Sequence, residues 1–230
     1  MLMVYPKSIP VMMLPSITLF PNTMLPLHIY EPRYCRMLHR SLQNHRLMAI
    51  TMRKPEMVRE MPHKTAGLGM IRAAVRHADG TAHIILQGVA RIRLQKATSY
   101  KPFRVHSYDL LETKRGSEKR IQSLRQKLVD LVSMHLEQGK GVMQKIKSSF
   151  SECNKDIGGT SDHPSMEGAL VNLVQIQDVE QLANLVSCTF ISKPQARQLI
   201  LEESDLESRL THLVAFLMGE IFCRKRKGKA

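Results

Sequence analysis

Residues 14–42, LPSITLFPNTMLPLHIYEPRYCRMLHRSL, constrain the fold of this chain more than any other stretch. From Met24 to Tyr30, apolar residues alternate with other residues, as in a strand with one buried face. Pro26 lacks an N–H group, so we expect this strand at the edge of a sheet, at a bulge or at its own start. The earlier apolar run from Ile17 to Phe20 predicts a first strand that ends at Pro21.

A helix is expected directly after the second strand. Pro32 suits the first helical position, and Glu31 lies before it, at the positive end of the helix dipole. The spacing of the following apolar residues predicts one buried helix face, made of Tyr34, Met37, Leu38 and Leu42. We therefore expect Tyr34 to be largely buried.

The run LFPNTMLPLHIYEPRY resembles the opening signature of the Lon N-terminal domain, the substrate-binding domain of Lon proteases. That signature reads L-F-P, a turn, and then L-P-L-H-I-F-E-P-R-Y. Tyr30 replaces the Phe here, and Asn22 stands where the family often has Gly; Asn tolerates the positive φ that such a turn needs. Glu31 and Arg33 are expected to pair and to tie the helix to the strands. We interpret the matching residues as mainly structural: Phe20, Pro21, Pro26, His28, Glu31, Pro32, Arg33 and Tyr34.

The next part of the chain predicts further strands. Asp79-Gly80 is a typical hairpin turn between two of them, and Gly88 permits a bend in the second. Residues 67–94 resemble the Lon N-terminal domain again, and the resemblance implies a PUA-like lobe. Six or seven strands with one inserted helix predict a closed or partly closed small β-barrel. The expected strands cover residues 47–52, 66–77, 81–94 and 103–111, with a loop at 54–65 and a loose extension at 1–13.

Beyond residue 112 the pattern becomes helical. Apolar spacing predicts a long helix over residues 118–137, which Gly139 and Gly141 would end. Mixed loop and short helix are expected over 142–164, followed by three helices. Three possible capping boxes begin at Asp178, Ser192 and Ser204. The last helix has an apolar stripe, made of Leu206, Leu210, Leu213, Val214, Leu217 and Ile221.

The run LANLVSCTFISKPQARQLILEESDLESRLTHLVAFL also resembles the helical lobe of the Lon N-terminal domain. We therefore predict an α+β fold in which a PUA-like small β-barrel lobe, residues 1–112, precedes an α-helical bundle lobe, residues 113–230. The resemblance implies a stand-alone Lon-like protein that lacks the ATPase and peptidase domains.

The motifs of enzymatic chemistry are missing from the sequence. No G-x-x-x-x-G-K-[ST] loop is present, and Gly139-Lys140-Gly141 is only a fragment of one. No Ser-Lys peptidase module is found either, so we expect no ATP or casein hydrolysis, no catalytic residues and no cofactor. The ten histidines show no metal-binding spacing, although His77 and His83 are expected to face each other across the hairpin.

The cysteines and the hydropathy bear on the compartment. Four cysteines, including Cys35, are widely spaced and fit free thiols in a reducing compartment. Cys35 lies between two arginines without an identifiable base, and we interpret it as an idle thiol. No apolar run has transmembrane length, and no clear signal peptide is present, so a cytoplasmic protein is expected.

The net charge of +14 leaves two hypotheses about partners. The resemblance implies that the protein binds polypeptide through apolar surface on the barrel or between the lobes. Alternatively, it binds RNA or other nucleic acid, as PUA-like barrels elsewhere do, although stacking aromatics are few. Arg91 and Arg93 would add a basic spot on the barrel. A candidate basic interaction tail comprises Arg224, Lys225, Arg226, Lys227 and Lys229.

Overall fold

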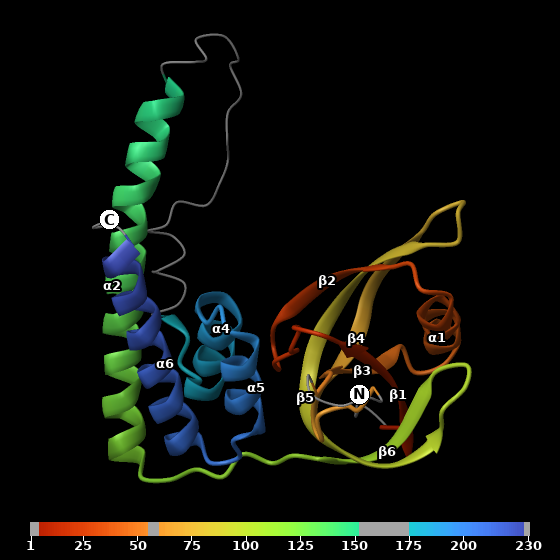
Figure 1. Ribbon diagram of the computed structural model, residues 1–230. Coiled ribbons are helices and arrows are strands. Elements are labelled where there is room, and N and C mark those ends of the chain that lie inside the picture. Colours follow the sequence, from red (N-terminus) through yellow and green to blue (C-terminus); the bar gives the residue numbers. More distant parts are fainter. Residues whose placement is uncertain (1–4, 55–59, 152–174, 228–230) are drawn as a thin grey trace.

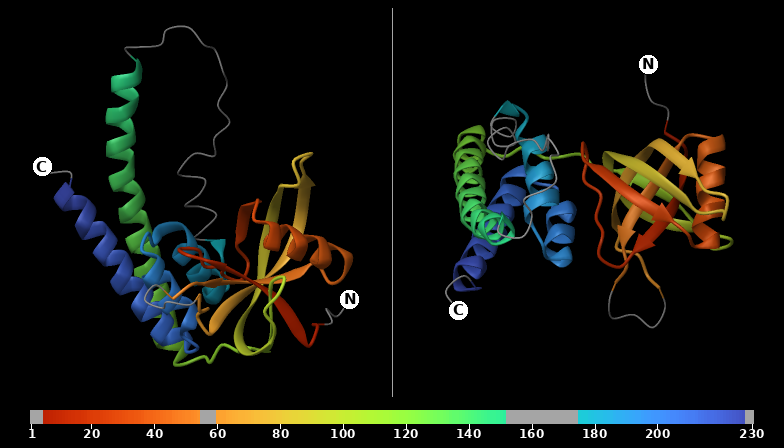
Figure 2. Two further views of the ribbon diagram at one scale, coloured as in Figure 1. Left: turned by 45° about the vertical axis from the view of Figure 1, so that its right-hand side comes forward. Right: turned by 90° about the horizontal axis from the view of Figure 1, so that it is seen from above.

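The computed structural model describes residues 5–54, 60–151 and 175–227. Strands and one helix form a β lobe, and four helices form a second lobe beside it (Figures 1 and 2). The connection between β6 (Arg104–Leu110) and α2 (Glu118–Ser151) joins the two lobes. The boundary predicted between residues 112 and 113 falls within this connection and stays a prediction. The α+β architecture with a barrel lobe before a helical lobe is confirmed.

The β lobe is a barrel built from six strands. Its sheet runs in the order β2-β5-β4-β3-β1-β6, and β6 also pairs with β5, which closes the sheet on itself. The strands are β1 (Ser8–Leu14), β2 (Met24–Ile29), β3 (Leu47–Met52), β4 (Thr65–Arg76), β5 (Ala82–Ser99) and β6. Because β5 is so long, its first half pairs with β2 and its second half with β6. β2 therefore lies at an edge, as Pro26 requires.

The first strand is not where the sequence places it. Residues 8–14, expected in a loose extension, form β1, which pairs with β3 in parallel and with β6 in antiparallel fashion. Prolines at positions 6 and 10 interrupt the sequence pattern that would otherwise predict this strand. Pairing with β3 begins only at Val11, just after Pro10, so the missing N–H of Pro10 breaks no bond to β3. Residues 17–20, expected as a strand, are a buried loop instead.

Helix α1 (Pro32–Gln43) closes one end of the barrel (Figure 1). Its apolar face is the predicted one, because Tyr34, Met37 and Leu38 are buried in the same core cluster as Ile84 and Leu86 of β5. This packing fixes which face of the neighbouring strands looks inward and which looks outward.

The helical lobe consists of α2, α4 (Val179–Phe190), α5 (Pro194–Glu202) and α6 (Leu206–Lys227). The predicted end of the long helix is wrong: α2 continues past Gly139 and Gly141, because glycine lowers helix stability by only about 1 kcal/mol and does not stop a helix. Residues 142–151, predicted as mixed structure, belong to α2, and 152–164 lie outside the described residues. The described residues contain no helix long and apolar enough to cross a membrane.

The helix caps agree with the sequence at one of three places. Asp178 caps α4 by accepting a hydrogen bond from the N–H of Glu180. The box predicted at Ser192 is wrong, because α5 begins at Pro194 and the Ser192 hydroxyl donates to Glu220 instead. At α6, Asp205 rather than Ser204 accepts from a helix N–H. The predicted stripe of the last helix packs against the other helices, with Val214 half-buried and its other members buried.

Candidate functional site

The two lobes share a core at Phe20. This signature residue leaves the barrel in the buried loop before β2 and lies in the hydrophobic core of the helical lobe, with 0% of its surface exposed. Three polar contacts surround this joint: Arg197 of α5 donates to the carbonyl of Ser16, Gln198 of α5 donates to that of Thr65, and His63 lies 3.0 Å from Glu202. The barrel therefore has a fixed position on the helices.

Arg91 belongs to this joint and not to a basic surface spot, which corrects the sequence prediction. Only 2% of Arg91 is exposed, and its guanidinium donates to the carbonyls of Leu201 and Glu203 at 3.2 and 2.6 Å. Burial, followed by repulsion from Arg209, lowers the pKa of Arg91 to about 10. Arg93, two residues on, is exposed.

Three further residues, Arg209, Glu180 and Thr113, extend the hydrogen bonds of Arg91 into a network. Arg209, which is fully buried, donates to Glu180 at 2.8 Å, and Thr113 in the connection between the lobes donates to the same carboxylate at 2.5 Å. Arg91 donates to Thr113 at 2.8 Å. Burial alone would raise the pKa of Glu180, but the hydrogen bonds from Thr113 and Arg209 outweigh it, so that pKa is lowered.

Glu31 and Arg33 form the expected pair at the start of α1. The Arg33 Nε–Glu31 Oε2 distance is 2.8 Å, and Nη1 of Arg33 reaches Glu60 at 3.0 Å. The hydrogen bond to Glu60 is the largest contribution that raises the pKa of Arg33, and Arg33 lowers the pKa of Glu60. Arg104 of β6 also donates to the Glu60 carbonyl at 2.7 Å. The pair therefore ties the helix start to the barrel.

Tyr34 is buried as predicted, with 5% of its surface exposed. Its hydroxyl accepts from the N–H of Met13 at 3.2 Å and donates to the Met13 carbonyl at 3.1 Å. Burial raises the pKa of Tyr34. The tyrosine thus secures α1 to β1, the strand that the sequence pattern does not reveal.

The β2-β5-β4 part of the sheet has an inner and an outer face. Ala82, Ile84 and Leu86 of β5 point inward and are buried against the α1 cluster, so the alternate positions point outward. The register then places three rows of side chains side by side on the outer side. We call these residues the outer face: Met24, Pro26, His28, Arg72, Ala73, Val75, His83, Ile85 and Gln87.

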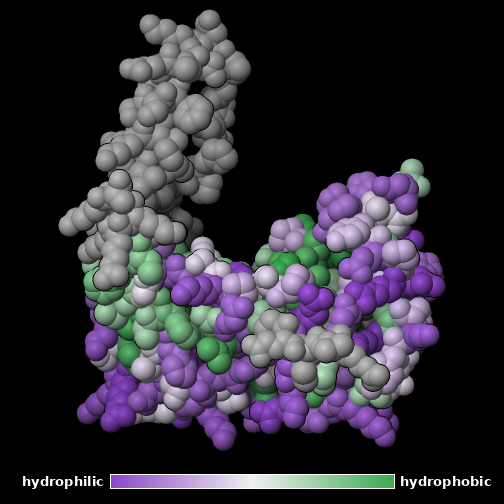
Figure 3. Space-filling model, in the orientation of Figure 1, coloured by the Kyte–Doolittle hydropathy of each residue, from purple (hydrophilic) through white to green (hydrophobic). Residues whose placement is uncertain are grey.

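Three large apolar side chains are exposed across the outer face. Met24 is 55% exposed, Val75 60% and Ile85 41%. The surface between β2, β5 and β4 is a shallow, apolar pocket of about 400 Å³. Figure 3 shows the molecule hollowed between the lobes, with apolar surface on the β lobe beside the hollow. The lining residues are Pro26, Leu27, His28, Ala73, Val75, His83, Ile84 and Ile85.

Three histidines lie at one end of the outer face. Nε2 of His77 is 2.7 Å from Nδ1 of His83, which confirms the cross-strand contact expected from the hairpin turn. The ring of His28 stacks on His83 with centroids 4.6 Å apart, and Tyr30 lies 5.7 Å from His28. Among the described residues, no three His, Cys, Asp or Glu side chains are grouped to hold a metal ion.

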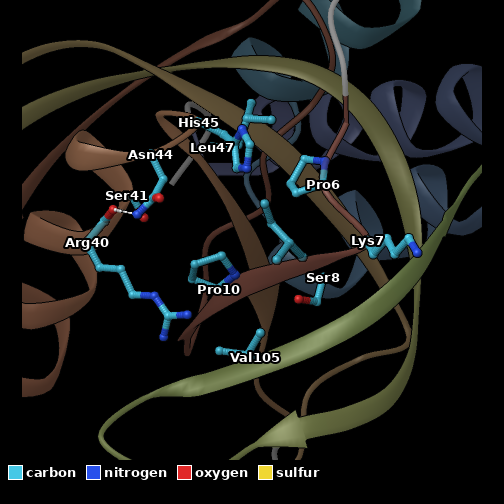
Figure 4. Close-up of a pocket in the computed structure, with 11 residues that line it drawn as sticks. Pro6, Lys7, Ser8, Pro10, Arg40, Ser41, Asn44, His45, Leu47 and Val105 are labelled. Carbon is cyan, nitrogen blue, oxygen red and sulfur yellow. Dashed lines mark hydrogen bonds between the residues drawn. The ribbon is translucent and has the colours of Figure 1, made fainter.

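A second pocket, of about 200 Å³, lies where the N-terminal segment meets the end of α1 (Figure 4). Arg40 and Lys7 both line it, but they come from opposite sides and Lys7 points away in the close-up. Asn44 Nδ2 donates to the Arg40 carbonyl at 2.7 Å and is thereby occupied. The polar groups do not converge on one point, so we assign no ligand to this pocket.

The other residues that the sequence analysis singled out form no further site within the described part of the chain. Cys35 is a free, half-buried thiol, with Sγ 3.8 Å from the Ile29 carbonyl. His39 and His45 are exposed, as expected. The backbone of Arg224 to Lys227 continues α6, whereas the side chains of the basic tail lie outside the described residues.

These features define a class of protein: a small barrel joined rigidly to a helical lobe, with an apolar sheet face beside the hollow between them. Residues 8–218 match the model of the substrate-binding domain of ATP-dependent protease La (Lon). The chain belongs to this family.

Comparisons with single proteins agree. The Lon protease of Dictyoglomus thermophilum is 21% identical over 219 residues, which cover 94% of this chain and 25% of that protein. The Lon protease of Rickettsia conorii is 24% identical over 224 residues, covering 94% and 26%. The chain thus spans about a quarter of the length of these relatives.

Solved structures show the same fold. The N-terminal domain of a Mycobacterium avium complex Lon protease matches with a TM-score of 0.65 at 15% identity, covering 92% of this chain and 98% of that one. A Lon N-terminal domain protein from Xanthomonas campestris matches with a TM-score of 0.58, also at 15% identity, covering 92% and 99%.

Of the outer face, the sequence patterns pointed only to Pro26, His28 and His83. The other residues of the outer face could not be predicted, because a strand pattern shows which positions alternate but not which face of the strand a helix covers. One signal was available: the segments 24–29, 71–76 and 82–87 contain no Asp or Glu. In an exposed hairpin such a composition is unusual, since polar outer faces normally carry charges of both signs.

Proposed function

We propose that this chain is a non-enzymatic module that binds polypeptide at the outer face. The observation that carries the proposal is the exposure of Ile85 on the central strand of this face, with Met24 and Val75 exposed on the two neighbouring strands. Contiguous exposed apolar surface of this kind marks interaction sites, because it would otherwise be covered in a folded protein. The family description, a substrate-binding domain of a protease, supports a polypeptide as the ligand.

Two further features support this proposal. The outer face is held from beneath by Ile84 and Leu86, which are buried in the same core cluster as Tyr34 of α1, so the face needs no ordering before it binds. Pro26 and Val75 offer stiff apolar side chains, which lose little conformational entropy in a contact. Nucleic acid is a weaker candidate, because Arg91 is buried in the joint and does not reach solvent.

The binding test uses a fluorescently labelled, permanently unfolded protein and measures its anisotropy as the full chain is added. Ile85→Ser and Val75→Ser should each weaken binding about tenfold, because each removes one apolar side chain that the bound polypeptide would bury. Leu110→Ser, which changes an exposed residue of β6, is the matched control and should bind normally. Equal affinity of all four proteins would contradict the proposal.

We also expect the purified chain to hydrolyse neither ATP nor casein, since the phosphate-binding loop and the peptidase module are missing from its sequence. Turnover that a point substitution in this chain abolishes would overturn the non-enzymatic assignment.

A further inference from the structure

The outer face carries an arginine at one end, two stacked histidines at the other and no carboxylate between them. Arg72 lies at one end, where its Nε donates to Gln87, which pairs with Met24 in the register. His28 and His83 lie at the other end, stacked on each other. The apolar row of Pro26, Ile85 and Ala73 lies between the two ends, from the register of the three strands.

The acidic residues that flank these strands in the sequence, Asp79 and Glu31, are already engaged. Asp79, in the hairpin turn beyond His77, accepts from both the N–H and the hydroxyl of Thr81. Glu31, which follows β2, is paired with Arg33. No carboxylate therefore neutralises Arg72 or the histidines from within the three strand segments.

We propose that the outer face selects an extended polypeptide segment with an apolar centre and acidic side chains on either side of it. This inference rests on the proposed function and names the chemistry of its substrate. Charge complementarity is the reason: a ligand carboxylate near Arg72 meets an unopposed cation, whereas a ligand lysine meets repulsion.

The geometry also gives the spacing. Gln87, beside Arg72, and His83 are four residues apart on β5, which corresponds to about 13 Å at roughly 3.3 Å per residue. An extended ligand that lies along the strands covers the same length in four residues. Its acidic side chains should therefore stand four residues apart, with the apolar side chain midway between them over Ile85.

Three fluorescein-labelled peptides test this pattern against the full chain. They share one sequence with a central Leu and differ only at two positions, two residues before and two after it, which are both Glu, both Gln or both Lys. The Glu peptide should bind tightest and the Lys peptide weakest. Arg72→Gln should weaken the Glu peptide by between about one-and-a-half-fold and five-fold and leave the Gln peptide unchanged.

Arg76→Gln is the matched control. Arg76 is also exposed and on β4, but it points to the other side of the sheet, where it contacts His39 of α1. This variant should bind all three peptides like the unchanged protein. His83→Gln should also reduce the preference for the Glu peptide. This variant tests the end of the outer face where His28 and His83 lie.

The outcomes separate the two proposals. If the Glu and Gln peptides bind equally well and Ile85→Ser weakens both, the acidic preference is wrong and polypeptide binding stands. If no peptide binds, both proposals fall. If an oligouridylate displaces the Glu peptide and binds the outer face more tightly than any peptide, the cations serve phosphates, and the polypeptide occupant is wrong.

Discussion

The carbonyl oxygen of Phe20 lies so close to Gly88 that only glycine fits at position 88. A β-carbon there would stand 1.9 Å from that oxygen. Gly67 has the same relationship with the carbonyl oxygen of Leu19, at 2.0 Å. The loop before β2 therefore lies directly on strands β4 and β5. This close approach places the Phe20 side chain in the helical lobe and so sets the position of the barrel.

Gly88→Ala should destabilise the protein strongly. The new methyl group meets backbone atoms of Phe20 and Pro21, which cannot move aside as a flexible side chain would. We expect a loss of about 3 kcal/mol or more in the free energy of unfolding, measured by urea denaturation.

Gly219→Ala is the matched control, because nothing lies within 4 Å of a β-carbon at this position of α6. Alanine is the better helix former, so this change should stabilise the protein by up to about 1 kcal/mol. A Gly88→Ala protein as stable as the unchanged one would show that the loop does not need this contact.

Strands β2 to β6, α1 and the stripe of α6 could be predicted because each carries a strong period in its own residues. Asn22 shows the same for turns: its φ of 61° is the positive value that the signature turn requires. β1 could not be predicted, because its evidence is the pairing with β3 and β6, which are distant in sequence. The predicted end of α2 was wrong for a different reason: glycines at 139 and 141 weaken a helix without ending it.

Glu180→Gln should lower stability in a pH-dependent way. The substitution leaves Arg209, which is fully buried, without its charged partner, at an expected cost of about 1–3 kcal/mol at neutral pH. The folded-state pKa of Glu180 lies below its ordinary value, so the carboxylate stabilises the fold above the unfolded pKa of about 4.3. This contribution is lost as the pH falls through the folded-state pKa.

The measurement is urea unfolding of both proteins between pH 3 and pH 7. The difference in free energy should be largest near pH 7 and should shrink towards the acid end. Glu118→Gln, which changes an exposed acid at the start of α2, should stay within about 0.5 kcal/mol throughout. A constant difference for Glu180→Gln across this range would contradict the assigned role of the carboxylate.

The candidate site was less predictable than the fold. Arg91 looked like a surface cation from its alternating neighbours, and only its bonds to the carbonyls of Leu201 and Glu203 reveal that it is buried. Those partners lie more than one hundred residues away. In contrast, the contact of His77 with His83 was predictable, because a short hairpin turn brings its flanking positions together.

Removing residues 224–230 should leave polypeptide binding nearly unchanged. The deletion removes five cations, and this loss would weaken binding strongly if contacts to phosphates dominated. Each phosphate contact on duplex DNA contributes about 0.9 to the slope of the logarithm of the binding constant against the logarithm of the salt concentration. Apolar contacts respond much less to salt. A truncated protein that loses all polypeptide binding at physiological salt would show that the tail, and not the outer face, holds the partner.

Photocrosslinking tests the central claim most directly, because it reports where a bound chain lies. Benzoylphenylalanine is placed at position 85 on the outer face or at position 110 on β6, and each full-length protein is irradiated with the labelled unfolded protein. If a bound polypeptide lies on the outer face, a strong covalent adduct should form from position 85 and little from position 110. Adducts that form equally from both positions, or from position 110 alone, would contradict it.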